Sequence, residues 1–381
     1  MATNNNNKAL NVPHLRFPEF SGEWKKCIIQ DYGEVITGNT PPTNNAEYYN
    51  NGSYLWASPA DLGTGKKIND TKTKLSESGF KKTRIIPKGS ILVTCIGSTI
   101  GKIGMAVETM SSNQQINSII VNEKSNNDFV YYAISRAFPR YLSEVGVQAV
   151  PILSKSNFEK LPNYTTSIEE QDKTGYFLNL LDERIATQNK IIDKLQSLIK
   201  GISNKIFATI QGIEYRMGNI VTISNGNSNV QDAVTESKDG LYPFFDRSED
   251  IKYLPTFLFD KEAIIYPGEG AEFMPRYFRG KFALHQRCYA IFDFKEIINA
   301  QFLYFYLKTQ NSYFVRNAVG STVPSLRLDT FQKLKVIIPP KKIQHSVSLC
   351  LSSMEQKCNV EKDILQKLLK QKQYLLRQMF I

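Results

Sequence analysis

One stretch in the middle of the chain, from about Glu169 to Phe207, constrains the fold more than any other. Apolar residues recur there in alternating steps of three and four, the heptad period that keeps one stripe of a helix facing a partner helix. The predicted seam is Leu178, Leu181, Ile185, Gln188, Ile192, Leu195, Ile199, Ile202 and Ile206. At about 1.5 Å per residue this helix is about 50–55 Å long. Such a helix cannot bury its stripe alone, so the chain must supply a partner.

The partner helix lies at the C-terminus and is found by aligning the chain with itself. With a shift of 173 residues, Gln171 falls on Gln344 and Phe207 falls on Phe380. The second seam is then Leu351, Met354, Cys358, Glu361, Leu365, Leu368, Lys372, Leu375 and Met379. Polar seam residues cost stability but can fix the register of a helix pair. We therefore predict two long helices that pack against each other.

Length and composition limit what surrounds these helices. A chain of 381 residues is too long for one ordinary core, so two domains with shared elements are expected. Its apolar runs are far shorter than the ~20 residues of a membrane span, so no membrane partner is expected. Five cysteines without a CxxC pair, and only three histidines, disfavour a metal site and predict reduced thiols in a cytoplasmic protein. A net charge of +11 favours a polyanionic partner.

The segments that precede the two helices resemble each other weakly, and each reads as a small α+β domain. In the first, strands are predicted at Tyr54–Ala57, Ser90–Ile96 and Ile116–Val121, and a helix at Asp128–Tyr141. Anchors return in the second segment, where Lys261–Ile265 repeats Lys88–Leu92 and Thr222–Asn227 repeats Glu34–Asn39. The order domain, helix, domain, helix predicts a pseudo-two-fold molecule with antiparallel helices. Two domains that share a framework but differ in their loops suit a target with two different halves.

Several motifs resemble the specificity subunits of type I restriction-modification systems. The arm Leu15–Phe20 ending in Trp24 is similar to that family's N-terminal signature. Ile168–Gln171 with Leu180–Ile185, and later Ser203–Phe207, are similar to the start and end of its central conserved helix. The second copy departs from the pattern because it has no such arm and lacks the paired glutamates at its helix start. The departures bear on whether the two ends offer equal docking surfaces.

The resemblance implies an α+β fold with two similar target recognition domains, separated by two long antiparallel coiled-coil helices. The corresponding ranges are 1–22 for the N-terminal tail and arm, 23–166 for recognition domain 1, 167–210 for the central conserved helix, 211–340 for recognition domain 2, and 341–381 for the C-terminal conserved helix.

The same resemblance implies a non-catalytic subunit that reads a bipartite double-stranded DNA site and docks two modification subunits. Those partners would bind S-adenosylmethionine and methylate adenine at N6, and a restriction motor-nuclease using ATP and Mg²⁺ could join them. No cofactor is expected in this chain itself. The residues agree, because no adenine-methyltransferase motif, hydrolase elbow or nuclease cluster is visible. Cys95–Gly104 falls one residue short of a phosphate loop and has Ile103 after its lysine.

Basic residues near aromatic or hydroxyl side chains are the DNA-binding candidates. They are Lys66, Lys67, Lys81, Lys82, Arg84, Ser98, Thr99 and Lys102 in the first domain, and Arg247, Arg276, Arg279, Lys281 and Arg287 in the second. Arginine can pair with guanine through two donors, whereas lysine more often meets phosphate. Asn113, Gln114 and Gln115 could read adenine, although a polar network in the core is the favoured interpretation, and His285 is open in the same way.

Two alternatives remain at the level of sequence. A basic coiled-coil scaffold would join proteins and show no sequence-dependent affinity for DNA. A specificity partner of a fused nuclease-methyltransferase would differ from the leading hypothesis only in the identity of its partner.

Overall fold

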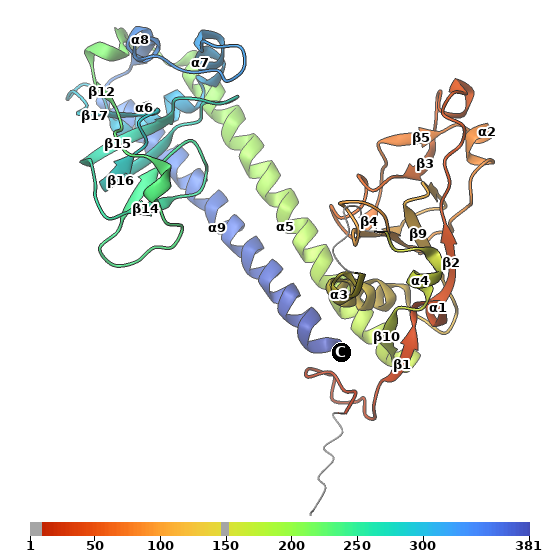
Figure 1. The fold of residues 1–381 in the computed structure, drawn as a ribbon. Helices are drawn as coiled ribbons and strands as arrows, with labels where there is room; N and C mark the ends of the chain where they lie inside the picture. Colours follow the sequence, from red (N-terminus) through yellow and green to blue (C-terminus); the bar gives the residue numbers. More distant parts are fainter. Residues whose placement is uncertain (1–9, 146–151) are drawn as a thin grey trace, which may run out of the picture. The chain divides into compact units, whose positions relative to one another are not determined.

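In the computed structural model, residues 10–145 and 152–381 are described, and they divide into two compact units. The first comprises residues 1–189 together with 364–381, and the second comprises residues 190–363. Residues 1–9 of the predicted tail lie outside the described residues. Both long helices, α5 (Ile168–Thr209) and α9 (Lys341–Met379), contribute one stretch to each unit (Figure 1).

The first unit is built on a sheet of five strands in the order β2-β9-β6-β7-β4. These strands are β2 (Gly33–Thr37), β4 (Lys67–Ile68), β6 (Ile91–Thr94), β7 (Ile103–Ala106) and β9 (Ile116–Val121). A three-stranded sheet is formed by β3 (Tyr54–Ala57), β5 (Thr73–Leu75) and β8 (Ser111–Ser112), and a two-stranded one by β1 (Lys25–Ile28) and β10 (Pro162–Thr165). Its helices are α1 (Ile29–Tyr32), α2 (Glu77–Phe80), α3 (Asn127–Val145) and α4 (Lys155–Glu159), with a 3-10 turn η1 (Ala46–Tyr48).

The second unit has a six-stranded sheet in the order β12-β17-β15-β16-β13-β14. The strands are β12 (Thr222–Asn225), β13 (Tyr242–Phe245), β14 (Lys252–Leu254), β15 (Phe259–Pro267), β16 (Arg276–Leu284) and β17 (Cys288–Phe292). A separate pair joins β11 (Ile213–Arg216) to β18 (Lys335–Ile338). Helices α6 (Ala300–Lys308), α7 (Asn311–Asn317) and α8 (Leu328–Lys333) and the 3-10 turns η2 (Met217–Asn219) and η3 (Val230–Asp232) complete it.

The two domains share one framework, as the sequence repeat predicts. The order β2-β9-β6-β7 in the first sheet recurs as β12-β17-β15-β16 in the second. The registers also correspond, because Ile91 pairs with Ile119 across β6 and β9 while Ile264 pairs with Ile291 across β15 and β17. The longer first copy carries its additional residues as β4 and α2. Two similar α+β domains, each followed by a long helix, are therefore present.

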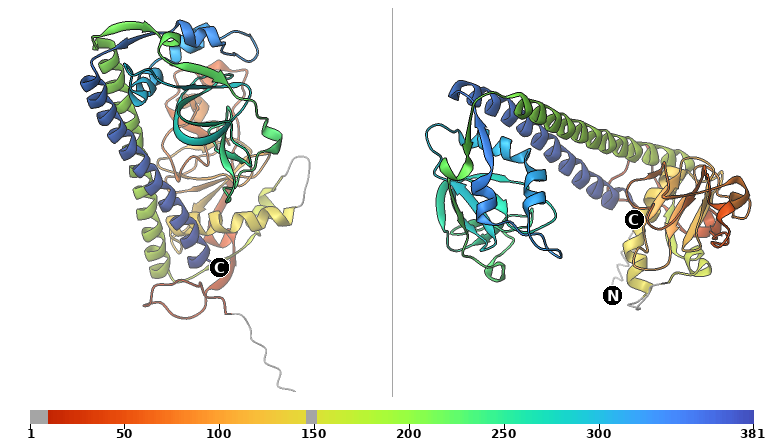
Figure 2. Two further views of the ribbon diagram at one scale, coloured as in Figure 1. Left: turned by 90° about the vertical axis from the view of Figure 1, so that its left-hand side faces the viewer. Right: turned by 90° about the horizontal axis from the view of Figure 1, so that it is seen from above.

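In each unit, α5 lies beside α9 and the two run antiparallel, which both views of Figure 2 show. In the first unit the early α5 residue Leu178 shares a core with the late α9 residues Leu375 and Met379. In the second unit the late α5 residue Phe207 shares a core with Leu351 near the start of α9. All eighteen predicted seam residues are buried or half-buried, whereas the residues flanking them on the helix are mostly exposed.

The same polar clamp holds each domain onto its helix. In the first unit, Gln171 accepts a hydrogen bond from the backbone N–H of Asn126 at 3.0 Å and donates to the Thr166 carbonyl at 2.9 Å. In the second, Gln344 accepts from the N–H of Asn299 at 2.7 Å and donates to the Pro339 carbonyl at 2.8 Å. Both asparagines cap the helix that follows them, α3 or α6, so that one glutamine fixes the start of a helix in each domain.

Candidate functional site

Three candidates of the second domain lie around the turn between β16 and β17 and the residues that follow β13. Arg247, His285 and Arg287 line a cavity of about 300 Å³ together with Val230, Asp246, Glu269, Gln286 and Cys288. Arg247 and Arg287 are exposed, and Arg287 forms an ion pair with Glu269 at 2.7 Å. The cavity therefore presents two guanidinium groups to solvent, one of them held by a carboxylate. Glu269 was not predicted, because nothing in the sequence near it marks it as a partner of Arg287.

The other candidates of this domain lie along β16. The Arg276 guanidinium lies 5.9 Å from the centre of the Phe245 ring and donates a hydrogen bond to the Ser248 carbonyl, so it is partly engaged in packing. Arg279 is exposed opposite Glu262 on the neighbouring strand. The Lys281 ammonium lies 4.8 Å from the centre of the Phe257 ring. The structure thus spreads these three along one strand rather than gathering them at the cavity.

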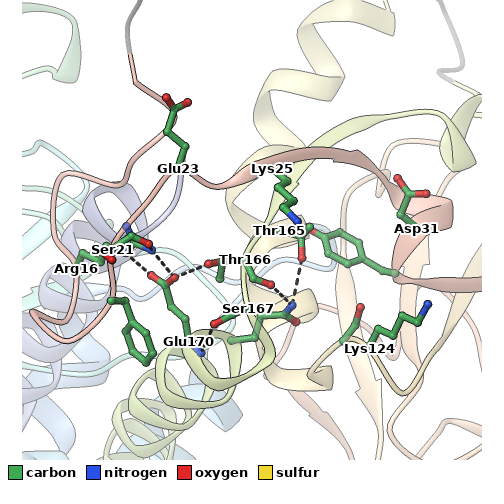
Figure 3. A pocket seen from close by; sticks show the side chains of 14 residues that line it. Arg16, Ser21, Glu23, Lys25, Asp31, Lys124, Thr165, Thr166, Ser167 and Glu170 are labelled. Carbon is green, nitrogen blue, oxygen red and sulfur yellow. Dashed lines mark hydrogen bonds and ion pairs between the residues drawn. The ribbon is translucent and has the colours of Figure 1, made fainter.

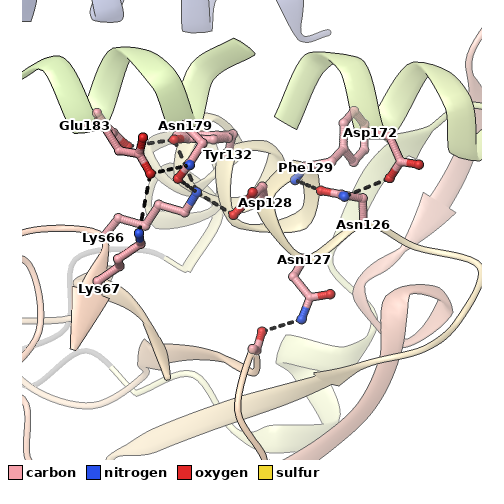
Figure 4. Close-up of polar contacts among 12 residues, drawn as sticks. Lys66, Lys67, Asn126, Asn127, Asp128, Phe129, Tyr132, Asp172, Asn179 and Glu183 are labelled. Atoms are coloured by element: carbon pink, nitrogen blue, oxygen red, sulfur yellow. Dashed lines mark hydrogen bonds and ion pairs between the residues drawn. The ribbon is translucent and has the colours of Figure 1, made fainter. Parts of the chain in front are cut away.

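Lys66, predicted to contact DNA, is instead buried where the first domain meets α5 (Figure 4). Its ammonium forms an ion pair with Asp128 at 2.5 Å and donates to the Asn179 side chain at 2.9 Å. Burial lowers the pKa of Lys66, and Asp128 opposes that effect. A contact with DNA would require this network to open, so we place Lys66 with the structural contacts of the junction. Its neighbour Lys67 is exposed, 3.6 Å from Glu183 of α5.

The basic residues after α2 are exposed on the first domain. Lys81 pairs with Glu77 at 2.6 Å, while Lys82 is exposed. Arg84 is exposed and donates to the Thr37 carbonyl at 2.6 Å. Surface pairs of this kind contribute little to stability, which leaves these side chains available for a phosphate backbone.

The glycine-rich segment forms the loop between β6 and β7. Gly97 and Gly101 have φ angles of 91° and 90°, which is the left-handed region that favours glycine. Ser98 is exposed, and the backbone carbonyl of Thr99 accepts a hydrogen bond from the Lys102 N–H at 3.1 Å. The Lys102 stem passes Gly63, where a Cβ atom would lie 3.1 Å from Lys102 Cγ. The loop therefore brings Ser98, Thr99 and Lys102 together, beside the Gln115 side chain near Gly97.

The N-terminal arm is tied to the start of α5 through a buried carboxylate (Figure 3). Arg16 donates from Nε and Nη2 to the two oxygens of Glu170, both at 2.7 Å, and Trp24 Nε1 donates to the same carboxylate at 3.2 Å. Burial disfavours the charged form, but hydrogen bonds from Arg16, Thr166 and Trp24 outweigh it and lower the pKa of Glu170. Arg16 and Glu170 line a cavity of about 470 Å³, and their ion pair is a structural contact between the arm and α5.

Among residues 10–145 and 152–381, no group of three or more His, Cys, Asp or Glu side chains could hold a metal ion. All five cysteines are free thiols. Within the described part of the chain, none of the helices has the length and apolar character that a membrane crossing requires.

Comparisons with known proteins agree on one family. A family model described as "Type I restriction modification DNA specificity domain" matches residues 21–197 and again 213–370. The specificity subunit of the MjaIX type I restriction enzyme of Methanocaldococcus jannaschii is 25% identical over 391 residues, which covers 90% of this chain and 89% of that protein. The HindI specificity subunit of Haemophilus influenzae is 32% identical over 186 residues, covering 46% and 40% of the two chains.

A solved structure shows the same fold. The crystal structure of a type I restriction-modification S subunit from M. genitalium superposes with a TM-score of 0.67 and 18% identity, covering 97% of this chain and 99% of that one. At this identity the match is one of fold. It includes both repeated domains and both long helices, since nearly all of each chain is covered.

Proposed function

The chain belongs to the type I restriction-modification DNA specificity family, and on this basis we propose that it reads a two-part DNA sequence, one part with each domain. As a specificity protein it recognises DNA sequence and is a non-catalytic component, in agreement with the prediction from sequence. Membership of this family therefore argues against the alternative of a basic coiled-coil scaffold that has no sequence-dependent affinity for DNA.

The observation that carries the two-part proposal is the repeat itself. Four strands have the same order in both domains, β2-β9-β6-β7 and β12-β17-β15-β16, yet the exposed side chains that the two domains present differ. The first presents Lys81, Lys82 and Arg84, whereas the second presents Arg247 and Arg287. One framework with two different surfaces suits two different half-sites. The net charge of +11 supports the same function, because neutralising DNA phosphates releases counterions.

We also propose two modification subunits as partners, which would carry S-adenosylmethionine and methylate adenine. The support is an exposed apolar residue at the equivalent position of each long helix, Tyr176 on α5 and Leu349 on α9. They are 63% and 64% exposed, and their C-terminal neighbours Phe177 and Cys350 are exposed as well. On α5 the exposed Leu180 lies one turn after Tyr176, and adjoining exposed apolar side chains of this kind mark a surface that another protein covers. A restriction subunit using ATP and Mg²⁺, and a cytoplasmic location, complete the proposal.

The function is tested by binding measurements on the full chain, alone and assembled with its modification subunit. We expect the assembly to contain two modification subunits and to bind one selected two-part duplex at least 1000-fold more tightly than random duplex, the lower end for specific DNA binding proteins. Affinity should fall steeply between 50 and 200 mM salt, by roughly 10³-fold for six or more phosphate contacts. Equal affinity for selected and random duplexes would contradict the proposal.

A further inference from the structure

An equivalent turn occurs in each domain, directly before β9 in the first and directly before β17 in the second. In the first domain it is residues 113–115, between β8 and β9, and in the second it is residues 285–287, between β16 and β17. Its first residue is anchored identically, because Asn113 N donates to the Ala57 carbonyl and His285 N to the Phe245 carbonyl, both at 2.9 Å. These carbonyls belong to equivalent strands, β3 and β13, which pair in parallel with β8 and β16. The two turns are thus structural counterparts.

Each turn is closed by the side chain of its first residue. Asn113 Oδ1 accepts a hydrogen bond from the N–H of Gln115 at 3.0 Å, and His285 Nδ1 accepts one from the N–H of Arg287 at 3.2 Å. Histidine therefore replaces asparagine in the same local contact. Because Nδ1 is the acceptor, the proton of neutral His285 lies on Nε2. Burial lowers the pKa of His285 despite the nearby Asp246, which favours this neutral form.

A glycine lets the neighbouring chain approach each turn closely. A Cβ atom on Gly38 would lie 2.3 Å from the Asn113 carbonyl oxygen, and one on Gly226 would lie 2.0 Å from the Leu284 carbonyl oxygen. Any larger residue would push the turn away at either position. Backbone from two other segments therefore contacts each turn: the strand that carries Ala57 or Phe245, and the segment that carries Gly38 or Gly226.

In each turn a neighbouring residue orients one exposed side chain. In the second turn Gln286, which stands at the position of Gln114, is exposed as well. In the first domain, Gln114 is exposed and its Oε1 accepts a hydrogen bond from the Thr40 hydroxyl at 2.5 Å. In the second, the side chain of Arg287 is 63% exposed, and its Nη1 is held at 2.7 Å by Glu269, which is itself only 18% exposed. An oriented side chain loses less conformational entropy when it binds. Neither residue packs into the core, so its orientation has no evident structural use.

The chemistry of the two side chains matches different bases. A glutamine amide offers one donor and one acceptor, which pair with N7 and N6 of adenine in the major groove. An arginine offers two parallel donors, which pair with O6 and N7 of guanine. The bond from Thr40 still leaves the second lone pair of Gln114 Oε1 and both amide hydrogens to a base. The neutral His285 beside Arg287 adds no third positive charge that would favour a phosphate over a base.

We propose that these two turns are the base-reading elements of the chain, with Arg287 selecting a guanine in one half-site and Gln114 selecting an adenine in the other. The inference rests on the proposed function, because it assigns residues to the reading of a two-part DNA sequence. It separates them from the exposed lysines, which meet phosphate and carry no base preference.

The test is selection from duplexes with randomised half-sites, using the full chain assembled with its modification subunit. For Arg287→Gln and Arg287→Lys we expect the preference for guanine at one position of one half-site to fall roughly 5- to 150-fold, as for loss of a two-donor pair. The lysine variant keeps the charge, so its salt dependence should stay that of the wild type. Gln114→Ala should weaken an adenine preference in the other half-site alone.

The matched control is Arg216→Gln, which removes an exposed arginine from the separate sheet formed by β11 and β18 and should leave the selected sequence unchanged. An unchanged selected sequence in the Arg287 variants, with binding weakened uniformly, would show a phosphate contact and overturn the inference. Changes in both half-sites from one substitution would overturn it as well. A wild-type assembly that selects no two-part sequence would instead contradict the proposed function, and this inference with it.

Discussion

Replacing Arg16 by methionine is expected to destabilise the first unit by about 3–5 kcal/mol, the usual effect of leaving a buried charge without its partner. Glu170 is 2% exposed and receives two charge-assisted hydrogen bonds from Arg16. Without the guanidinium, the carboxylate keeps only its contacts with Thr166 and Trp24. Chemical denaturation of the full chain, followed at Trp24 and Trp56, would measure the change.

A second substitution separates the lost charge from lost packing. The double variant Arg16→Met with Glu170→Leu should recover most of the lost stability, because a buried ion pair replaced by apolar residues is often neutral. The control is Lys173→Met, which removes an exposed ion pair with Glu19 and should change stability by less than about 1 kcal/mol. A double variant as unstable as Arg16→Met would contradict the assignment of the effect to an unpaired carboxylate.

The contribution of this pair depends on pH in a defined direction. The folded protein lowers the pKa of Glu170, so the stabilisation is complete above the ordinary glutamate pKa of about 4.3 and is lost as the pH falls through the lower folded value. The difference in stability between the wild type and Arg16→Met should accordingly shrink in acid.

Replacing either clamp glutamine by leucine is expected to cost about 2–4 kcal/mol in its own unit. Gln344 is buried and forms three hydrogen bonds with backbone groups, to Asn299, Ile297 and Pro339, and unsatisfied buried groups cost about 1–3 kcal/mol each. Gln171 has the corresponding contacts with Asn126 and Thr166. The two variants should therefore loosen different helices, α3 for Gln171→Leu and α6 for Gln344→Leu.

Hydrogen–deuterium exchange measured peptide by peptide distinguishes these outcomes. Gln344→Leu should speed exchange at the start of α6 and leave α3 protected, and Gln171→Leu should do the reverse. Gln356→Leu, an exposed change on the same helix as Gln344, serves as the control and should alter neither. Unchanged protection of α6 in Gln344→Leu would show that the clamp does not hold the domain onto its helix.

The long helices and the repeat could be predicted from sequence because both depend on periodic patterns. The heptad seams placed the buried face of α5 and α9 residue by residue, and the aligned glutamines Gln171 and Gln344 became equivalent clamps. Asn126 and Asn299 are also 173 residues apart, so the same self-alignment identifies them as equivalent positions. Periodicity and self-alignment reveal such positions without knowledge of the fold.

The contacts of individual polar residues could not be predicted, because their partners come from distant segments. Lys66 sits in a basic run, yet Asp128 and Asn179 reach it from two other elements. Asn113 is buried, as the core-network interpretation favoured, while its neighbour Gln114 is exposed. The pairing of Arg287 with Glu269 depends on the approach of β15 to β17, and residue 269 matches an isoleucine, Ile96, in the first copy.

The most direct test of the two-reader account is a map of methylated adenines in DNA from cells that express this chain with its modification subunit. The account predicts one two-part consensus, in which two short fixed sequences flank a spacer of fixed length and unspecified bases. Methylation of one short continuous sequence would contradict it.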